Sequence, residues 1–183
     1  MVAIILLLGH AILWLNDIAG LDLEGVPIVG DGDSLSLNGE RIRLRGIDAP
    51  ELDQICRRAE ESYACGREAR KVLQDLVGTH PVTCRGTETD KYGRLLATCE
   101  AGGVELNSAM VESGWAVAYG SYVGNELAAR SAGRGLWQGE FDRPQDWRAG
   151  ENRAVADDGR QGPLDQLAAI LRQMLRAVFR LID

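Results

Sequence analysis

The sequence predicts an α+β fold in which a small β-barrel of five strands is combined with three helices, within residues 26–148. From residue 26 onward, apolar and polar side chains alternate, which is the period of a half-buried strand. Predicted strands cluster first, and helices lie between and after them, whereas a doubly wound sheet alternates the two regularly. The chain has 183 residues, of which 45% are hydrophobic, enough for one domain with its own core and terminal extensions.

The first strands are predicted to form a hairpin. The stretch SLSLNGERIRLRG alternates on both sides of Asn38-Gly39, a dipeptide that favours a tight two-residue turn. One face of this hairpin is apolar and consists of Leu35, Leu37, Ile42 and Leu44. The other face carries Arg41, Arg43 and Arg45.

The remaining elements follow in order along the chain. Apolar residues at helical spacing predict a helix over residues 65–76. Two strands, HPVTCRG and RLLATCEA, are separated by the turn TDKYGR. The segment VELNSAMVESG predicts a short helix ended by Gly114, and ELAARSAGRGLW predicts a further helix that reaches Trp137.

Segments of different composition flank the domain. Residues 1–20 contain the apolar run AIILLLGHAILWL, which is shorter than the roughly 20 residues of a membrane-spanning helix. We interpret it as a signal or anchor segment, with a core helix as the alternative. Residues 149–162 are polar and Gly-rich and predict a linker.

Residues 163–183 predict a separate amphipathic helix with a wide apolar surface. This helix could fold back on the N-terminal apolar run. Alternatively, it lies on an anionic membrane with Arg172, Arg176 and Arg180 at the headgroups. The expected partners therefore include a membrane contacted through the terminal helices, and no protein partner is inferred.

The charge balance limits the kinds of site the chain can build. The net charge is −7 and no segment is strongly basic, so a wide nucleic-acid-binding surface is not expected. Two histidines and the absence of any CxxC spacing argue against a zinc site. A polyanionic substrate would therefore be met by a local cluster of arginines, helped by a metal cation.

The span VGDGDSLSLNGERIRLRGIDAPE concentrates carboxylates and arginines. Taken alone, DGD is typical of turns, and Arg41 and Arg45 suit a solvated strand face. The spacing changes this interpretation, because Asp33, Arg43, Asp48 and Glu51 occur together and a later turn, DKYGR, supplies Arg94. Carboxylate oxygens hold hard cations, and guanidinium groups bind phosphate oxygens in pairs. This combination predicts a site for a phosphodiester and a metal ion.

The motifs DGDS, RLRGIDAPE and DKYGR, in this order, resemble the staphylococcal nuclease family over about residues 26–138. The resemblance implies a five-stranded OB-type barrel with three helices. It also implies calcium-dependent hydrolysis of DNA and RNA, with single strands favoured and 3′-phosphate ends left. The implied roles are the calcium ligands Asp33, Asp48 and the backbone carbonyl of Ala49, the general base Glu51, and the phosphate-binding Arg43 and Arg94.

The sequence departs from the best-known member of this family near the proposed metal. Ala49 stands where that member has threonine, and LDQICRRAEESYACG replaces the usual loop after Glu51. Tyr119 and Tyr122 lie where family tyrosines contact the nucleotide, although core packing is an alternative for Tyr119.

The four cysteines can form two disulfides. A turn centred on residues 91–92 places Cys84 directly opposite Cys99, within the distance a disulfide tolerates. Cys56 and Cys65 would then close the loop after Glu51. Four buried thiols are the alternative. Paired cysteines and the apolar N-terminal run together predict a periplasmic, secreted or membrane-anchored protein.

A non-catalytic OB module that binds nucleic acid or protein is the rival interpretation. Such modules typically lose the charged residues of the site, whereas this chain contains all of those that the resemblance assigns. The sequence therefore favours the enzyme.

Overall fold

The computed structural model describes residues 21–150. The predicted segment 1–20, nearly all of the predicted linker and the predicted helix 163–183 lie outside these residues. The chain divides into two compact units, with the boundary between Pro144 and Gln145, a few residues before the predicted boundary at 148. The fold below is that of residues 21–144. No helix within residues 21–150 combines the length and the apolar character needed to cross a membrane.

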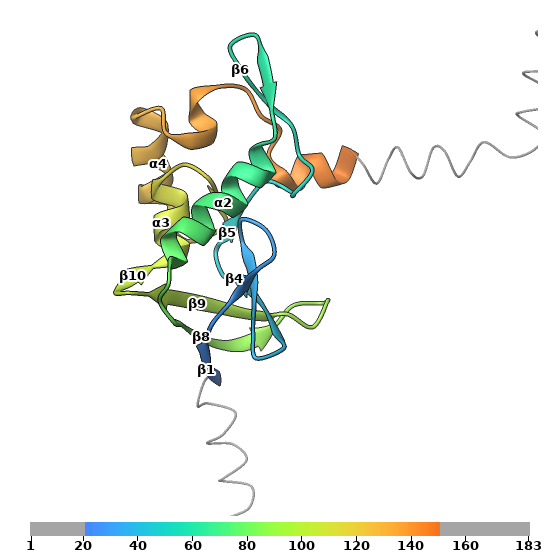
Figure 1. Ribbon diagram of the computed structural model, residues 1–183. Coiled ribbons are helices and arrows are strands. Elements are labelled where there is room, and N and C mark those ends of the chain that lie inside the picture. The colour runs from blue at the N-terminus through green and yellow to red at the C-terminus, as the bar shows by residue number, and fades with distance from the viewer. Residues whose placement is uncertain (1–20, 151–183) are drawn as a thin grey trace, which may run out of the picture. The chain divides into compact units, whose positions relative to one another are not determined.

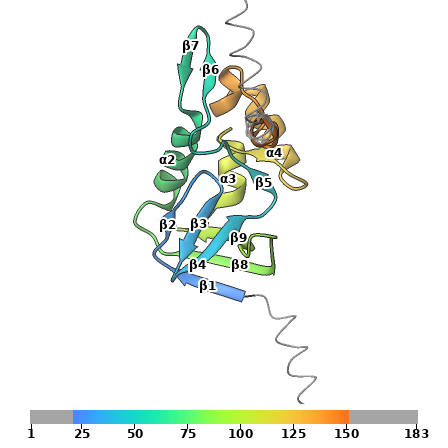
Figure 2. The ribbon, with the colours of Figure 1, turned by 90° about the vertical axis from the view of Figure 1, so that its right-hand side faces the viewer.

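A curled sheet forms the centre of the fold (Figure 1). Its strands are β1 (Leu21–Gly25), β2 (Ile28–Val29), β3 (Ser34–Leu37), β4 (Glu40–Leu44), β8 (Val82–Thr89), β9 (Leu95–Ala101) and β10 (Val104–Glu105). They run in the order β1-β8-β9-β4-β3-β2, and β10 pairs with β9. Only β4 and β9 are parallel within this sheet. The long strands β8 and β9 cross the direction of β3 and β4, so that the sheet bends into part of a barrel (Figure 2).

The α+β class and the barrel-like curvature are confirmed, but the sheet has seven strands rather than five. One unexpected strand is β1, which precedes residue 26 and pairs with β8 from Leu21↔Gly86 to Gly25↔Val82. Most of its side chains are exposed or half-buried, because it lies at the edge of the sheet. Its sequence LDLEG does alternate apolar and polar residues, but it lies before residue 26, where the domain was predicted to begin, and so it was not assigned as a strand.

The predicted hairpin is confirmed. Asn38 and Gly39 both adopt positive φ, 53° and 88°, as the two central residues of a type I′ turn require. Strand β3 therefore pairs with β4 in the register Leu37↔Glu40. The predicted apolar face is buried in the core and comprises Leu35, Leu37, Ile42 and Leu44.

Two of the three predicted helices agree closely with the structure, namely α2 (Cys65–Val77) and α3 (Leu106–Glu112). The third, α4 (Val123–Ser131), ends earlier than predicted and is followed by a short 3-10 turn, Gly135–Gln138. Gly133 and Gly135 have positive φ, 58° and 54°, which interrupts the helix. A Cβ atom at Gly135 would collide with the backbone of Gly114, so this glycine is also required by the close approach of two chain segments.

Helices α2 and α3 contribute to the same core as the sheet. Their buried apolar residues are Ala69, Leu73, Val77, Leu106, Met110 and Val111. The buried Asn107 of α3 accepts a hydrogen bond from the N–H of Cys99 (3.0 Å) and donates to the carbonyls of Ala97 (3.1 Å) and Arg45 (2.9 Å). This side chain fixes α3 to β9 and to the residue that follows β4.

Both predicted disulfides are present. Cys84 and Cys99 are register partners on β8 and β9, with Cα atoms 4.1 Å apart. Cys56 and Cys65, with Cα atoms 5.6 Å apart, join the start of a second hairpin to the first residue of α2. This hairpin consists of β6 (Cys56–Arg58) and β7 (Glu61–Tyr63). The four cysteines of the chain are thus paired, which rejects the alternative of four thiols.

These pairs predict that denatured, unreduced protein will have no titratable thiols. Reduction should lower the melting temperature, because each disulfide stabilises the folded state by about 2–3 kcal/mol through its effect on the entropy of the unfolded chain. For a domain of this size the combined fall should be about 10 °C or more. Thiol titration in denaturant and thermal unfolding with and without reductant are the measurements. Four reactive thiols in protein purified from its native compartment would contradict the pairing.

Candidate active site

Three of the predicted site residues meet at one end of the hairpin. Asp33 immediately precedes β3, Arg43 lies on β4 opposite Ser34, and Asp48 ends the short strand β5 (Ile47–Asp48). One terminal nitrogen of Arg43 donates to Oδ1 of Asp33 at 2.8 Å, and the other donates to Oδ1 of Asp48 at 2.6 Å. A single guanidinium therefore bridges two carboxylates that come from separate turns of the chain.

Asp33 is almost completely buried, with 3% of its surface exposed. Its Oδ2 accepts a hydrogen bond from the N–H of Ala49 at 3.0 Å, and its own N–H donates to Oδ1 of Asp31 at 3.0 Å. Burial raises the pKa of Asp33 to about 8, with further contributions from the negative charges of Asp31 and Asp48. The charge of Arg43 and the hydrogen bond from Ala49 oppose this rise without cancelling it.

The predicted metal ligand Ala49 is also buried and lies against the turn that contains Asp33. A Cβ atom at Gly32 would come within 2.7 Å of the Ala49 Cβ atom and 2.8 Å of the Ala69 Cβ atom. The glycine of the DGD motif therefore allows the turn to approach both the chain after β5 and helix α2. This close packing fixes the separation between the turn that carries Asp33 and the end of strand β5, which carries Asp48.

The strand that carries Asp48 is supported by a residue that sequence reasoning missed. β5 pairs with β11 (Val117–Ala118), in the register Val117↔Asp48. The N–H of Ala118 donates to Oε2 of Glu126 at 2.5 Å, and the other oxygen of Glu126 pairs with Arg130 and Arg143. Glu126 could not be identified as a supporting residue from the sequence alone, because most glutamates in amphipathic helices lie on the solvent-exposed face.

Glu51 lies in the loop between β5 and β6 and is partly buried. Its backbone carbonyl accepts a hydrogen bond from the N–H of Gln54 at 2.8 Å. Its backbone N–H donates to Oε1 of Gln54 at 3.2 Å. Gln54 therefore contacts both the N–H and the carbonyl of the Glu51 main chain, in a loop that differs from that of the family member noted above.

Arg94 lies just before β9 and is oriented by Asp90. Its Nε donates to Oδ2 of Asp90 at 2.8 Å, while Oδ1 of Asp90 accepts from the N–H groups of Arg94 and Tyr92 at 2.9 Å each. Burial alone would raise the pKa of Asp90, but these hydrogen bonds outweigh it and lower the pKa. Arg94 immediately precedes the strand that pairs with β4, on which Arg43 lies.

The two tyrosines occupy different environments. Tyr119 is 71% exposed, which excludes the core-packing alternative, and its N–H donates to the carbonyl of Gly46 at 2.8 Å. Tyr122 donates from its hydroxyl to Oε1 of Glu105 at 2.6 Å. Burial and the interaction with Glu105 raise the pKa of Tyr122 to about 12. The structure therefore presents Tyr119 to solvent and fastens Tyr122 to the start of α3.

The other two arginines of the hairpin remain outside the cluster, as predicted. Arg41 donates to the carbonyl of Tyr92 at 2.6 Å. Arg45 donates to the carbonyl of Leu96 at 3.2 Å and lies 3.4 Å from a carboxylate oxygen of Glu88 on the exposed face. Both arginines stabilise the outer surface of the β4–β9 pair.

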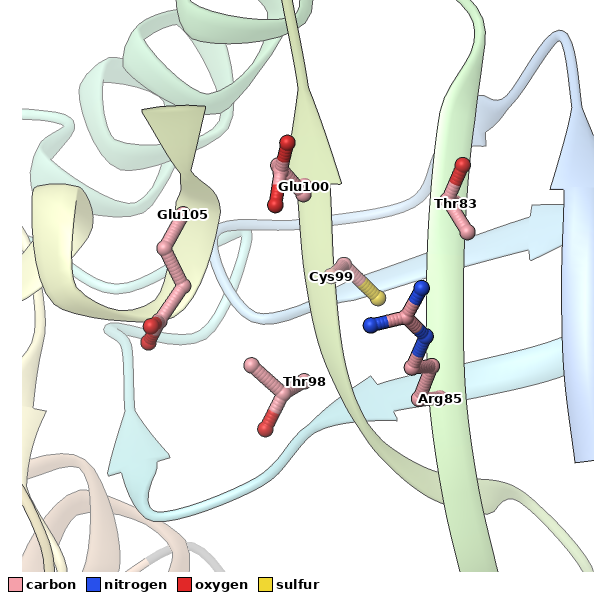
Figure 3. Close-up of a pocket in the computed structure, with 6 residues that line it drawn as sticks. All are labelled: Thr83, Arg85, Thr98, Cys99, Glu100 and Glu105. Atoms are coloured by element: carbon pink, nitrogen blue, oxygen red, sulfur yellow. The ribbon is translucent and has the colours of Figure 1, made fainter. Parts of the chain in front are cut away.

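A separate hollow of about 300 Å³ lies on the outer face of β8 and β9 (Figure 3). Its lining residues are Thr83, Arg85, Thr98, Cys99, Glu100 and Glu105. None of the residues predicted to contact a metal, a phosphate or a nucleotide lines it. The hollow touches the predicted site through Glu105 and Thr98, both of which interact with the side chain of Tyr122.

The donor atoms around Asp33 and Asp48 suit a hard cation. Carboxylate and carbonyl oxygens are the ligands that calcium prefers, and both carboxylates are held nearby by the same arginine. Within residues 21–150, no group of three or more His, Cys, Asp or Glu side chains could enclose a metal. A cation held by Asp33 and Asp48 would therefore complete its coordination with backbone carbonyl, water and substrate oxygens.

The curled sheet, its flanking helices and the buried aspartate pair define an OB-fold domain with a charged site beside one hairpin. The sequence model described as "Staphylococcal nuclease homologue" matches residues 41–139, which is more than half of the chain. The chain belongs to the staphylococcal nuclease family.

Several curated proteins are similar to this chain. The succinoglycan biosynthesis protein ExoI of Rhizobium meliloti is 36% identical over 129 residues, covering 62% of this chain and 66% of that protein. The probable staphylococcal-like nuclease CAN3 of Oryza sativa is 31% identical, over 76% of this chain and 37% of its own length. An uncharacterized endonuclease of Escherichia coli O157:H7 is 36% identical over 63% of this chain and 78% of its own length. The chain thus spans just under two thirds of the first relative and little more than a third of the second.

Proposed function

We propose that this protein is a calcium-dependent nuclease that hydrolyses phosphodiester bonds of DNA and RNA, with single strands favoured and 3′-phosphate ends produced. Membership of the family and the relatives named as nucleases or endonucleases support nuclease activity. The single observation that carries the proposal is the bridge from Arg43 to the buried carboxylates of Asp33 and Asp48. It joins a phosphate-binding group and hard cation ligands in one cluster.

The chemistry assigns a distinct task to each residue. A phosphodiester is negatively charged and repels an attacking hydroxide, so its oxygens must be neutralised. The guanidinium groups of Arg43 and Arg94 would bind phosphoryl oxygens and hold them more strongly as charge develops in the transition state. The carboxylate of Glu51 would accept a proton from the attacking water, a contribution worth typically ~10²–10⁴-fold. Calcium, when bound by Asp33 and Asp48, would supply positive charge as a Lewis acid.

Arg43 has a second task in this proposal. The oxygens that it contacts, Oδ1 of Asp33 and Oδ1 of Asp48, belong to the proposed cation ligands. Before a cation binds, Arg43 contacts both carboxyl groups through its two terminal nitrogens. During the reaction it would exchange these partners for phosphoryl oxygens. The arginine thus keeps the ligands close together before the metal and the substrate arrive.

Digestion of heat-denatured DNA tests the proposal. We expect cleavage with calcium, loss of cleavage in excess chelator, and recovery when calcium is restored. Magnesium should support activity poorly, because it is smaller and demands nearly ideal octahedral coordination, which a site with two carboxylates does not enforce. Gel analysis of the products at each metal concentration is the measurement. Full activity in chelator would rule out the metal assignment, and binding of DNA without cleavage would favour the non-catalytic OB module.

We also propose that the protein acts outside the cytoplasm, in the periplasm, after secretion or while anchored to a membrane. The two disulfides support an oxidising compartment, because structural disulfides are rare in reducing ones. Mass spectrometry of the protein from its native source, which locates the mature N-terminus and shows whether residues 1–20 remain, tests this part of the proposal.

A further inference from the structure

Gln54 is a fully buried polar residue in an otherwise exposed loop. Its neighbours Leu52 and Ile55 are 40% and 48% exposed, so the apolar side chains of the loop face outward while the amide faces inward. Burial of an amide costs free energy unless its hydrogen bonds are satisfied. This loop buries an amide and exposes its apolar side chains, the reverse of the usual arrangement. The hydrogen bonds of the Gln54 amide are therefore expected to determine the conformation of the loop.

Those contacts converge on Glu51. The backbone N–H of Gln54 donates to the carbonyl of Glu51 at 2.8 Å. The side-chain Oε1 of Gln54 accepts a hydrogen bond from the backbone N–H of Glu51 at 3.2 Å. Nε2 of Gln54 donates to the carbonyl of Asp142 at 2.8 Å. The side chain thus uses both ends of its amide, one for Glu51 and one for a segment 88 residues further along the chain.

The first turn of α2 also contacts both Gln54 and Glu51. The carbonyl of Gln54 accepts a hydrogen bond from the N–H of Gly66 at 3.4 Å. A Cβ atom at Gly66 would collide with the carbonyl of Glu51, so the helix contacts the Glu51 backbone directly. The disulfide between Cys56 and Cys65 ties the intervening hairpin to the same turn of the helix.

The hairpin is fastened to the segment around residue 140 as well. The N–H of Arg57 donates to the carbonyl of Glu140, and the N–H of Glu140 donates to the carbonyl of Arg57, both at 2.9 Å. Gln54 consequently lies where three segments meet: the loop that carries Glu51, the start of α2 and residues 140–142.

We propose that Gln54 is a positioning residue that fixes the main chain of Glu51 and thereby aims its carboxylate at the reacting water. This inference rests on the proposed function, in which Glu51 is the general base. A misplacement of a catalytic group by about 1 Å can cost ~10²-fold in rate. Because Gln54 is buried and its polar groups bind protein partners, it acts through Glu51 and does not bind substrate.

Gln54→Met removes both side-chain hydrogen bonds while keeping a similar shape. We expect kcat on denatured DNA at saturating calcium to fall by about tenfold or more, with KM within about twofold, because only the alignment of the chemical step is disturbed. Gln74→Met is the matched control, since Gln74 is exposed on α2, and it should leave both constants unchanged.

A double-mutant cycle with Glu51→Gln separates positioning from a general structural role. Once the general base has been removed, Gln54→Met should reduce kcat by less than about twofold further. A purely structural role would lower kcat by the same factor in both backgrounds. If Gln54→Met does not fold, Gln54→Asn replaces it in the same cycle, because it keeps a neutral amide that is too short to reach both Glu51 and Asp142.

The outcomes distinguish the inference from the function on which it rests. If Glu51→Gln leaves kcat unchanged, the proposed general base is wrong and the role of Gln54 is overturned with it. If Glu51→Gln is strongly impaired but Gln54→Met is not, or if the two losses multiply, the positioning role alone is overturned. A large loss at Gln54 that disappears in the Glu51→Gln background supports the inference.

Discussion

Replacing Arg94 with alanine is expected to lower kcat/KM on denatured DNA by about 100-fold or more. The loss of one preorganised donor that stabilises transition-state charge typically has this size. Asp90 already holds the Arg94 guanidinium through Nε and a terminal nitrogen, so little conformational freedom remains to be lost when a phosphate binds. Steady-state kinetics at saturating calcium measure the effect, and circular dichroism verifies that the variant is folded.

Arg45→Ala is the matched control for this prediction. Arg45 belongs to the same strand face as Arg43, but its contacts are the carbonyl of Leu96 and the exposed Glu88. Exposed ion pairs of this kind contribute little, so kcat/KM should change by less than about threefold. Equal losses for Arg94→Ala and Arg45→Ala would show that the phosphate-binding arginine has been assigned wrongly.

The calcium requirement is expected to depend steeply on pH. The pKa of Asp33, raised to about 8 by burial, means that its carboxyl holds a proton below that pH and loses it above. A cation can bind this carboxylate only after the proton leaves. The calcium concentration that gives half-maximal activity should therefore fall by about tenfold for each pH unit as the pH rises toward 8, and then level off. Initial rates over a series of calcium concentrations between about pH 6 and 9 measure this.

Asp31→Asn provides a specific check on the cause. An asparagine at position 31 keeps a side-chain oxygen that can accept the 3.0 Å hydrogen bond from the Asp33 N–H, but it removes a charge that raises the Asp33 pKa. The pH at which the calcium requirement levels off should consequently move downward. Asp75→Asn, which removes the same charge from the exposed face of α2, should not move it. A calcium midpoint that is independent of pH in the parent protein would contradict the assignment of Asp33 as a metal ligand.

Local chemistry made part of the fold predictable from sequence. Asn38-Gly39 determines its own turn, and the two-residue period on each side then determines which side chains are buried. The same reasoning from a turn centre placed Cys84 opposite Cys99. The end of α4 was missed because helical periodicity continues through the sequence, whereas Gly133 and Gly135 adopt left-handed conformations that a tertiary contact requires.

The candidate site was likewise predictable only in part from the sequence. Residue type and spacing indicated which side chains suit a cation and a phosphate, and the structure brings Asp33, Arg43 and Asp48 together. The supporting residues Gln54 and Glu126 could not be predicted, because their roles depend on hydrogen bonds to distant backbone segments. A glutamine in a polar loop and a glutamate in an amphipathic helix look like ordinary surface residues until their burial is known.

Strand β1 has a practical consequence for expressing the isolated domain. Residues Leu21–Gly25 pair with β8 over five register positions, so they form the edge strand on that side of the sheet. A recombinant protein truncated to begin at residue 26 would leave β8 as an exposed edge strand with unpaired backbone N–H and C=O groups. Exposed edge strands pair with other chains and promote aggregation. Insolubility of such a truncated protein would then reflect the missing strand, and a start before Leu21 is needed to obtain the domain with its sheet covered.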